Sequence, residues 1–154
     1  MNLKEIEILL VEDNMADVYL INRAFKNNHL LNKLHHVKDG YEAIHFIFGT
    51  DTYKKNPLVQ PKLILLDLKM PKMDGMEVLK ILKSNETTKH IPIVVLTSSK
   101  QDPDIKKCYN LGANSYVVKA INFRDFSNAV SELGTYWMLQ NQPSTQHIID
   151  YDWV

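Results

Sequence analysis

The chain has 154 residues, and its 18 lysines and arginines balance 18 aspartates and glutamates, so the formal net charge is zero. This length suits one domain around a single core. The zero net charge does not indicate a basic surface that would bind nucleic acid or an anionic membrane. No apolar run approaches the ~20 residues that a membrane-spanning helix needs. The single cysteine, Cys108, is interpreted as a packing residue, and these features favour a cytoplasmic protein.

Four apolar runs predict strands that are buried on both faces. They are residues 8–11, 63–66, 93–96 and 116–118, and charged or hydroxyl-bearing residues follow each of them at once. Such runs are typical of a parallel sheet between two helical layers, and a weaker run at 34–37 predicts an edge strand. Because parallel strands point the same way, the polar residues that follow them gather at one edge, where open α/β folds bind ligands.

Apolar residues at three- and four-residue spacing predict helices between and after these strands. We expect Asn14 to cap the first helix, and Asp102 to cap the fourth with Pro103 in its first position. In the fifth helix, apolar side chains recur over about four turns from Phe123 to Trp137. The alternation of strands and helices predicts a doubly wound α/β domain.

Polar residues at the ends of four strands form the candidate site. Glu12 and Asp13 follow the first strand, Asp67 follows the third, Thr97 follows the fourth and Lys119 follows the fifth. Neighbouring carboxylates repel one another, so they either raise a pKa or hold a hard cation such as Mg²⁺. Asp67 would then be a nucleophile toward a phosphoryl group, whose charge Lys119 and the cation would neutralise and whose oxygen Thr97 would hydrogen-bond.

Each of these residues, taken alone, has an ordinary structural explanation. A single acid after a strand is most often a helix cap or a turn residue, as we expect for Asp74 before Gly75, and a single lysine is usually a solvated amine. The combination of acids, hydroxyl and amine after four strands of one sheet is far rarer. The combination therefore favours the functional interpretation.

The motifs, in this order and spacing, resemble the receiver domain of two-component response regulators. Four stretches carry the resemblance: 11–14, 66–75, 96–98 and Lys119. It covers about residues 5–140 and implies a flavodoxin-like fold, in which a five-stranded parallel sheet of order 2-1-3-4-5 is surrounded by five helices. We therefore expect a receiver domain over residues 1–142 and a C-terminal tail over residues 143–154.

The resemblance implies roles for the acidic residues. Asp67 would accept a phosphoryl group from a sensor histidine kinase. The chain would then be a signalling phosphoacceptor that assists its own phosphorylation and dephosphorylation, and not an enzyme. The implied cofactor is Mg²⁺, and its ligands would come from Glu12, Asp13, Asp67 and the backbone carbonyl of Lys69.

The resemblance also implies a switch. Lys119 would pair with the phosphoryl group, Thr97 would be drawn toward it, and Tyr116 would rotate inward behind Thr97. A changed surface on the fourth helix, the fifth strand and the fifth helix would then act on a downstream protein. The chain departs from the family at Ala120, because receivers usually have proline there, joined to the lysine by a cis peptide. A cis bond before a non-proline residue costs about 3–4 kcal/mol.

The alanine leaves a second function open, a receiver-fold binding module whose partners do not depend on phosphorylation. A magnesium-dependent phosphatase is disfavoured, because Lys69 stands where such an enzyme has a second acid.

The connection 49–61 and the segment 136–139 are similar to those of single-domain regulators associated with phytochromes. The apolar surface of the last helix predicts a homodimer, and cover by the tail is the competing explanation.

Overall fold

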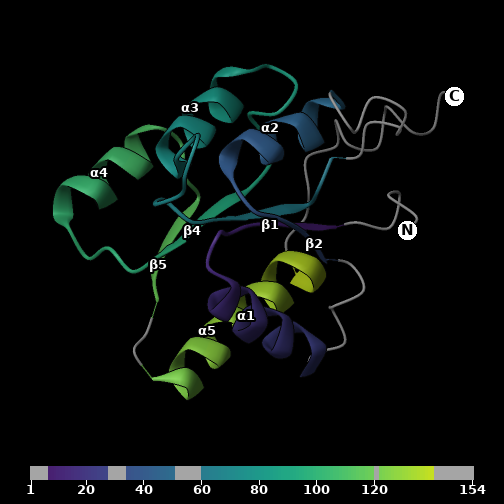
Figure 1. Cartoon of the computed structure of the whole chain (residues 1–154), viewed down its shortest axis with the longest axis vertical. Helices are drawn as coiled ribbons and strands as arrows, with labels where there is room; N and C mark the ends of the chain where they lie inside the picture. The colour runs from purple at the N-terminus through teal and green to yellow at the C-terminus, as the bar shows by residue number, and fades with distance from the viewer. Residues whose placement is uncertain (1–6, 28–33, 51–59, 120–121, 141–154) are drawn as a thin grey trace, which may run out of the picture.

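The computed structural model describes residues 7–27, 34–50, 60–119 and 122–140, which form a three-layered α/β domain (Figure 1). The central layer is a parallel sheet with the strand order β2-β1-β3-β4-β5. The strands are β1 (Ile8–Val11), β2 (Leu34–Val37), β3 (Leu63–Leu66), β4 (Ile93–Thr97) and β5 (Ser115–Val118). This order confirms the predicted fold, including the edge position of β2.

Helices cover both faces of the sheet, with α1 and α5 on one face and α2, α3 and α4 on the other (Figure 1). Their bounds are α1 (Met15–Asn27), α2 (Gly40–Phe48), α3 (Gly75–Ser84), α4 (Asp102–Asn110) and α5 (Phe123–Thr135), and a π-helical turn η4 (Tyr136–Gln140) continues α5. The predicted helices are confirmed, and the π-helical turn is an addition. Within the described ranges, every helix is too short or too polar to cross a bilayer.

Two apolar clusters pack against the sheet, one on each face, because side chains of a strand point alternately to opposite sides. In β1, Leu9 and Val11 join the cluster under α2, α3 and α4, whereas Leu10 joins the cluster under α1 and α5. Cys108 of α4 is fully buried in the first cluster, as expected of a packing residue. The central strands β1, β3 and β4 are therefore buried on both faces. The run 116–118, which was predicted to be buried in the same way, lies in the edge strand β5 and is only partly buried.

The helix starts agree with the sequence in one case and differ in another. Asn14 caps α1, since its side-chain oxygen accepts two backbone N–H groups of the first turn. The expected cap at Asp102 is wrong, because Gln101 precedes the helix and Asp102 is its first residue. The physical reason is the first hydrogen bond of the helix, because the N–H of Ile105 donates to the carbonyl of Gln101 at 3.1 Å. Pro103 is therefore the second residue of α4 and not the first.

The C-terminal helix packs beside α1. Phe126 is buried in the apolar cluster that α1 and α5 share, and Trp137 packs against this cluster while partly exposed. The tail 143–154 lies outside the described residues, and so does Ala120. The domain boundary at residue 142 and the geometry of the Lys119–Ala120 peptide bond therefore stay predictions.

Candidate functional site

Three carboxylates meet at the carboxyl edge of the sheet. Glu12 and Asp13 follow β1, and Asp67 follows β3, which pairs with β1. One carboxylate oxygen from each of the three residues lies within 4.8 Å of the others. Glu12 and Asp67 are buried, whereas Asp13 is exposed. Oxygen donors this close together suit a hard divalent cation, so these residues fit the ion that the resemblance implies.

Glu12 is fixed by hydrogen bonds on both its side chain and its backbone. Its Oε1 accepts the N–H of Asn14 at 3.1 Å, and its carbonyl oxygen lies 2.7 Å from Nε2 of His36, which is therefore the protonated ring nitrogen. Burial raises the pKa of Glu12 to about 7 against the opposing hydrogen bond from Lys119, and the charge of Asp67 adds to the rise. A cation bound at this carboxylate would favour its charged form and so oppose the raised pKa.

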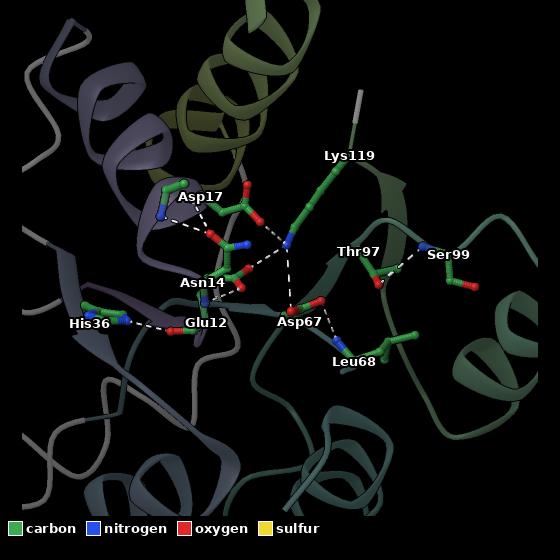
Figure 2. Close-up of polar contacts among 10 residues, drawn as sticks. Glu12, Asn14, Asp17, His36, Asp67, Leu68, Thr97, Ser99 and Lys119 are labelled. Atoms are coloured by element: carbon green, nitrogen blue, oxygen red, sulfur yellow. Dashed lines mark hydrogen bonds and ion pairs between the residues drawn. The ribbon is translucent and has the colours of Figure 1, made fainter. Parts of the chain in front are cut away.

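Lys119 connects the end of β5 to the acids, as Figure 2 shows. Its Nζ lies 2.7 Å from Glu12 Oε2, 2.7 Å from Asp17 Oδ2 and 3.7 Å from Asp67 Oδ2. The first two contacts are charge-assisted hydrogen bonds, and the third is an ion pair without one. Although burial opposes it, the hydrogen bonds to Asp17 and Glu12 raise the pKa of Lys119, so its amine is charged at neutral pH.

Asp17 is the residue of this network that sequence reasoning missed. It lies in the first turn of α1, where an acid already has a local explanation in the helix dipole. One signal was available, because the Asn14 cap places the start of α1 directly after the acid pair. The first turn of α1 must therefore lie at the same edge of the sheet as the candidate site.

Asp67 is positioned by the loop between β3 and α3. Its Oδ1 accepts the N–H of Leu68 at 2.9 Å, and its own N–H donates to the carbonyl of Val11 at 3.0 Å. Gly75 lies so close that a Cβ built on it would be 2.2 Å from the carbonyl oxygen of Asp67. Lys69 lies in this loop with an exposed side chain, and its carbonyl as an ion ligand stays a prediction.

The two residues predicted to switch, Thr97 and Tyr116, belong to the neighbouring strands β4 and β5. Thr97 is fully buried at the end of β4, and the N–H of Ser99 approaches its Oγ1 at 3.5 Å. The hydroxyl of Tyr116 donates to the carbonyl of Ser99 at 2.9 Å, and its ring packs on the cluster under α2, α3 and α4. The loop after Thr97 is therefore attached to Tyr116 on β5, and the switching roles of both residues stay predictions.

The chain belongs to the response regulator receiver domain family, since the model of this family matches residues 8–131. It is 38% identical over 135 residues to the probable methanogenesis regulatory protein FilR2 of Methanothrix harundinacea (strain 6Ac), with 88% of this chain and 85% of that protein covered. It is 39% identical over 131 residues to the response regulator Rcp1 of Synechocystis sp., with 85% of this chain and 88% of that protein covered.

Solved structures agree with this assignment. The phosphorylated cyanobacterial phytochrome response regulator RcpA superposes with a TM-score of 0.82 at 38% identity, covering 88% of this chain and 96% of that chain. The Mn²⁺-bound form of Rcp1 gives a TM-score of 0.80 at 36% identity, covering 89% of this chain and 97% of that chain. These neighbours confirm the resemblance to phytochrome-associated response regulators of two-component systems.

Proposed function

We propose that the chain accepts a phosphoryl group from a sensor histidine kinase on Asp67, in a Mg²⁺-dependent reaction, and signals through the surface of α4, β5 and α5. The observation that carries this proposal is the cluster of three carboxylates with the Lys119 ammonium 3.7 Å from Asp67. Family membership supports it, because receiver domains are signalling phosphoacceptors and are not classed as enzymes. The phosphorylated state of the relative RcpA supports it as well.

The two carboxylate oxygens of Asp67 are not equivalent. Oδ1 accepts the N–H of Leu68, whereas Oδ2 faces Lys119, so Oδ2 is the oxygen we assign as the nucleophile. It would attack the phosphorus atom of the kinase phosphohistidine, and the phosphorus–nitrogen bond would break as an acyl phosphate forms on Asp67. This chain would assist the transfer and the later hydrolysis by orienting the reacting groups.

The acids and Lys119 would neutralise and orient the transferred group. Glu12, Asp13, Asp67 and the carbonyl of Lys69 would hold Mg²⁺, which when bound supplies positive charge beside the phosphoryl oxygens. The Mn²⁺-bound form of Rcp1 supports a divalent ion in this family. Lys119 would donate to a phosphoryl oxygen, because the ammonium already lies beside Asp67.

A signal would leave the site through the loop between β4 and α4. Phosphorylation adds about −1.5 to −2 charge, which would draw the hydroxyl of Thr97 toward Asp67. The carbonyl of Ser99, two residues further on, accepts the Tyr116 hydroxyl, so a shift of this loop would act on β5. The Ser99 hydroxyl donates to Asp104, so the same shift would act on α4.

The proposed partners are a sensor histidine kinase and a downstream protein. The proposed location is the cytoplasm, where ATP is available to the kinase.

We also propose a homodimer through the C-terminal helix, because Tyr136 is 49% exposed and Trp137 is only partly buried. Sedimentation with and without beryllium fluoride measures this association. A monomer at tens of micromolar under both conditions would contradict it.

The test of the main proposal is incubation with a small-molecule phosphodonor and Mg²⁺, followed by mass spectrometry. Wild type should gain the mass of one phosphoryl group, and Asp67→Asn should not. The matched control is Asp74→Asn in the same loop, which should still gain the mass because asparagine also caps helices. A gain in Asp67→Asn, or no gain in wild type, would reject the proposal.

A further inference from the structure

Asp17 contacts Lys119 without belonging to the ion-binding cluster. Its Oδ2 lies 2.7 Å from Lys119 Nζ, and its side chain is 24% exposed. The acids whose oxygens lie within 4.8 Å of one another are Glu12, Asp13 and Asp67. Asp17 therefore acts on the site through the ammonium of Lys119.

The ammonium has three N–H donors, and the structure assigns partners to two of them. Among the described residues, Lys119 donates to Glu12 and to Asp17. The third donor has no short contact with Asp67, because 3.7 Å exceeds the length of a hydrogen bond. With these two donors taken, the third remains for a group beside Asp67 Oδ2, which Nζ faces at 3.7 Å (Figure 2).

Glu12 and Asp17 are unequal anchors for this lysine. Oε1 of Glu12 accepts a backbone N–H and Oε2 accepts Lys119, so a cation bound to Glu12 competes with Lys119 for the same carboxylate. Asp17 is fixed on the first turn of α1 and takes no part in that competition. The residue after Lys119 is alanine, which does not restrict the backbone as proline does.

We propose that Asp17 is a positioning residue for phosphoryl transfer. It holds the ammonium of Lys119 beside Asp67, so that the oxygens of a phosphoryl group on Asp67 meet an ammonium that is already in place. The inference rests on the proposed function of Asp67. It gives a role in the site to Asp17 in the first turn of α1, which lies outside the cluster of three acids. An oriented donor stabilises the phosphoryl group more than a free donor does, because the donor does not have to be ordered when the phosphoryl group arrives.

Simple Coulomb repulsion predicts the opposite effect of Asp17. A negative charge near the site repels an anionic phosphoryl group, so its removal would strengthen anion binding if position did not matter. Positioning predicts that removal weakens anion binding, because Lys119 then loses its second anchor. The direction of the change therefore separates the two explanations.

The experiment measures the affinity for beryllium fluoride, a phosphoryl mimic, at saturating Mg²⁺ by ¹⁹F NMR titration. Asp17→Ala should weaken it by about tenfold, the size of one charge-assisted hydrogen bond. Asp17→Asn should weaken it less, because the asparagine oxygen still accepts from Lys119, and Asp17→Glu should recover most of the loss. The affinity for Mg²⁺ alone should change less than the affinity for beryllium fluoride. The matched control is Asp125→Ala, since Asp125 is an exposed first-turn acid of α5.

Unchanged or tighter binding of beryllium fluoride in folded Asp17→Ala, or tighter binding in folded Asp17→Asn, would overturn the inference. Equal weakening of Mg²⁺ and beryllium fluoride binding would overturn it too, because that is the result of general damage to the site. Wild type that binds no beryllium fluoride with Mg²⁺ present would instead reject the proposed function of Asp67. Thermal unfolding of each variant identifies those that are folded.

Discussion

Glu12 and Lys119 form an ion pair of 2.7 Å, although 107 positions separate them in the sequence. The side chains are 1% and 12% exposed, respectively. Two carboxylates other than Glu12, those of Asp17 and Asp67, lie within 4.0 Å of the same ammonium. Lys119 therefore pairs with a group of buried and partly buried acids, and the loss of this lysine has a cost that the loss of a surface lysine would not have.

Lys119→Met should lower the free energy of unfolding by about 3 kcal/mol in metal-free buffer, because it leaves buried carboxylates without a cation. Urea denaturation with a chelator measures this loss, and added Mg²⁺ should reduce it by supplying positive charge. The control is Lys62→Met, which removes an exposed pair with Glu7 and should cost less than about 1 kcal/mol. Equal losses in the two variants would contradict the buried pair as the cause.

The raised pKa of Glu12 predicts a stability that depends on pH. In the folded protein the Glu12 carboxyl has a pKa of about 7, whereas in the unfolded chain it loses its proton near the ordinary value of 4.5. Between these values the folded state binds more protons, so the stability of the metal-free protein should fall as pH rises through this range. Urea denaturation across this range should show a smaller fall in Glu12→Gln, and parallel curves for the two proteins would contradict the assignment.

Gly75→Ala should destabilise the loop that carries Asp67. A Cβ at this position would lie 2.2 Å from the carbonyl oxygen of Asp67 and 2.7 Å from Cα of Leu68, so backbone must move. We expect a loss of about 3 kcal/mol in urea denaturation, at the upper end of overpacking. Gly112→Ala is the comparison, because there the side chain of Lys83 is the nearest neighbour and a positive φ is the main obstacle. An unchanged midpoint for Gly75→Ala would contradict the close approach.

Much of the fold follows from local sequence, because a strand buried on both faces needs a continuous apolar run. The positions of Asp13 and Asp67 follow too, since parallel strands end at one edge. Asp17 was not predictable in the same way: a first-turn acid already has a local role, and only the reach of Lys119 gives it another. The start of α4 was misplaced by one residue, because the first helical hydrogen bond runs from the N–H of Ile105 to the carbonyl of Gln101, which the Asp102-Pro103 pattern does not indicate.

Tyr116→Phe removes the hydrogen bond of 2.9 Å to the carbonyl of Ser99 and leaves the ring in its apolar cluster. The expected cost in stability is about 1 kcal/mol, because one partly buried hydrogen bond is lost. The larger effect should be local: amide hydrogen exchange should become faster in the loop after Thr97 and in the first turn of α4, with little change in β1 and β3. Tyr19→Phe is the control, since Tyr19 is 64% exposed. If the loop keeps wild-type protection in Tyr116→Phe, then the contact between Tyr116 and Ser99 does not hold the loop, and the route from Thr97 to β5 must use other contacts.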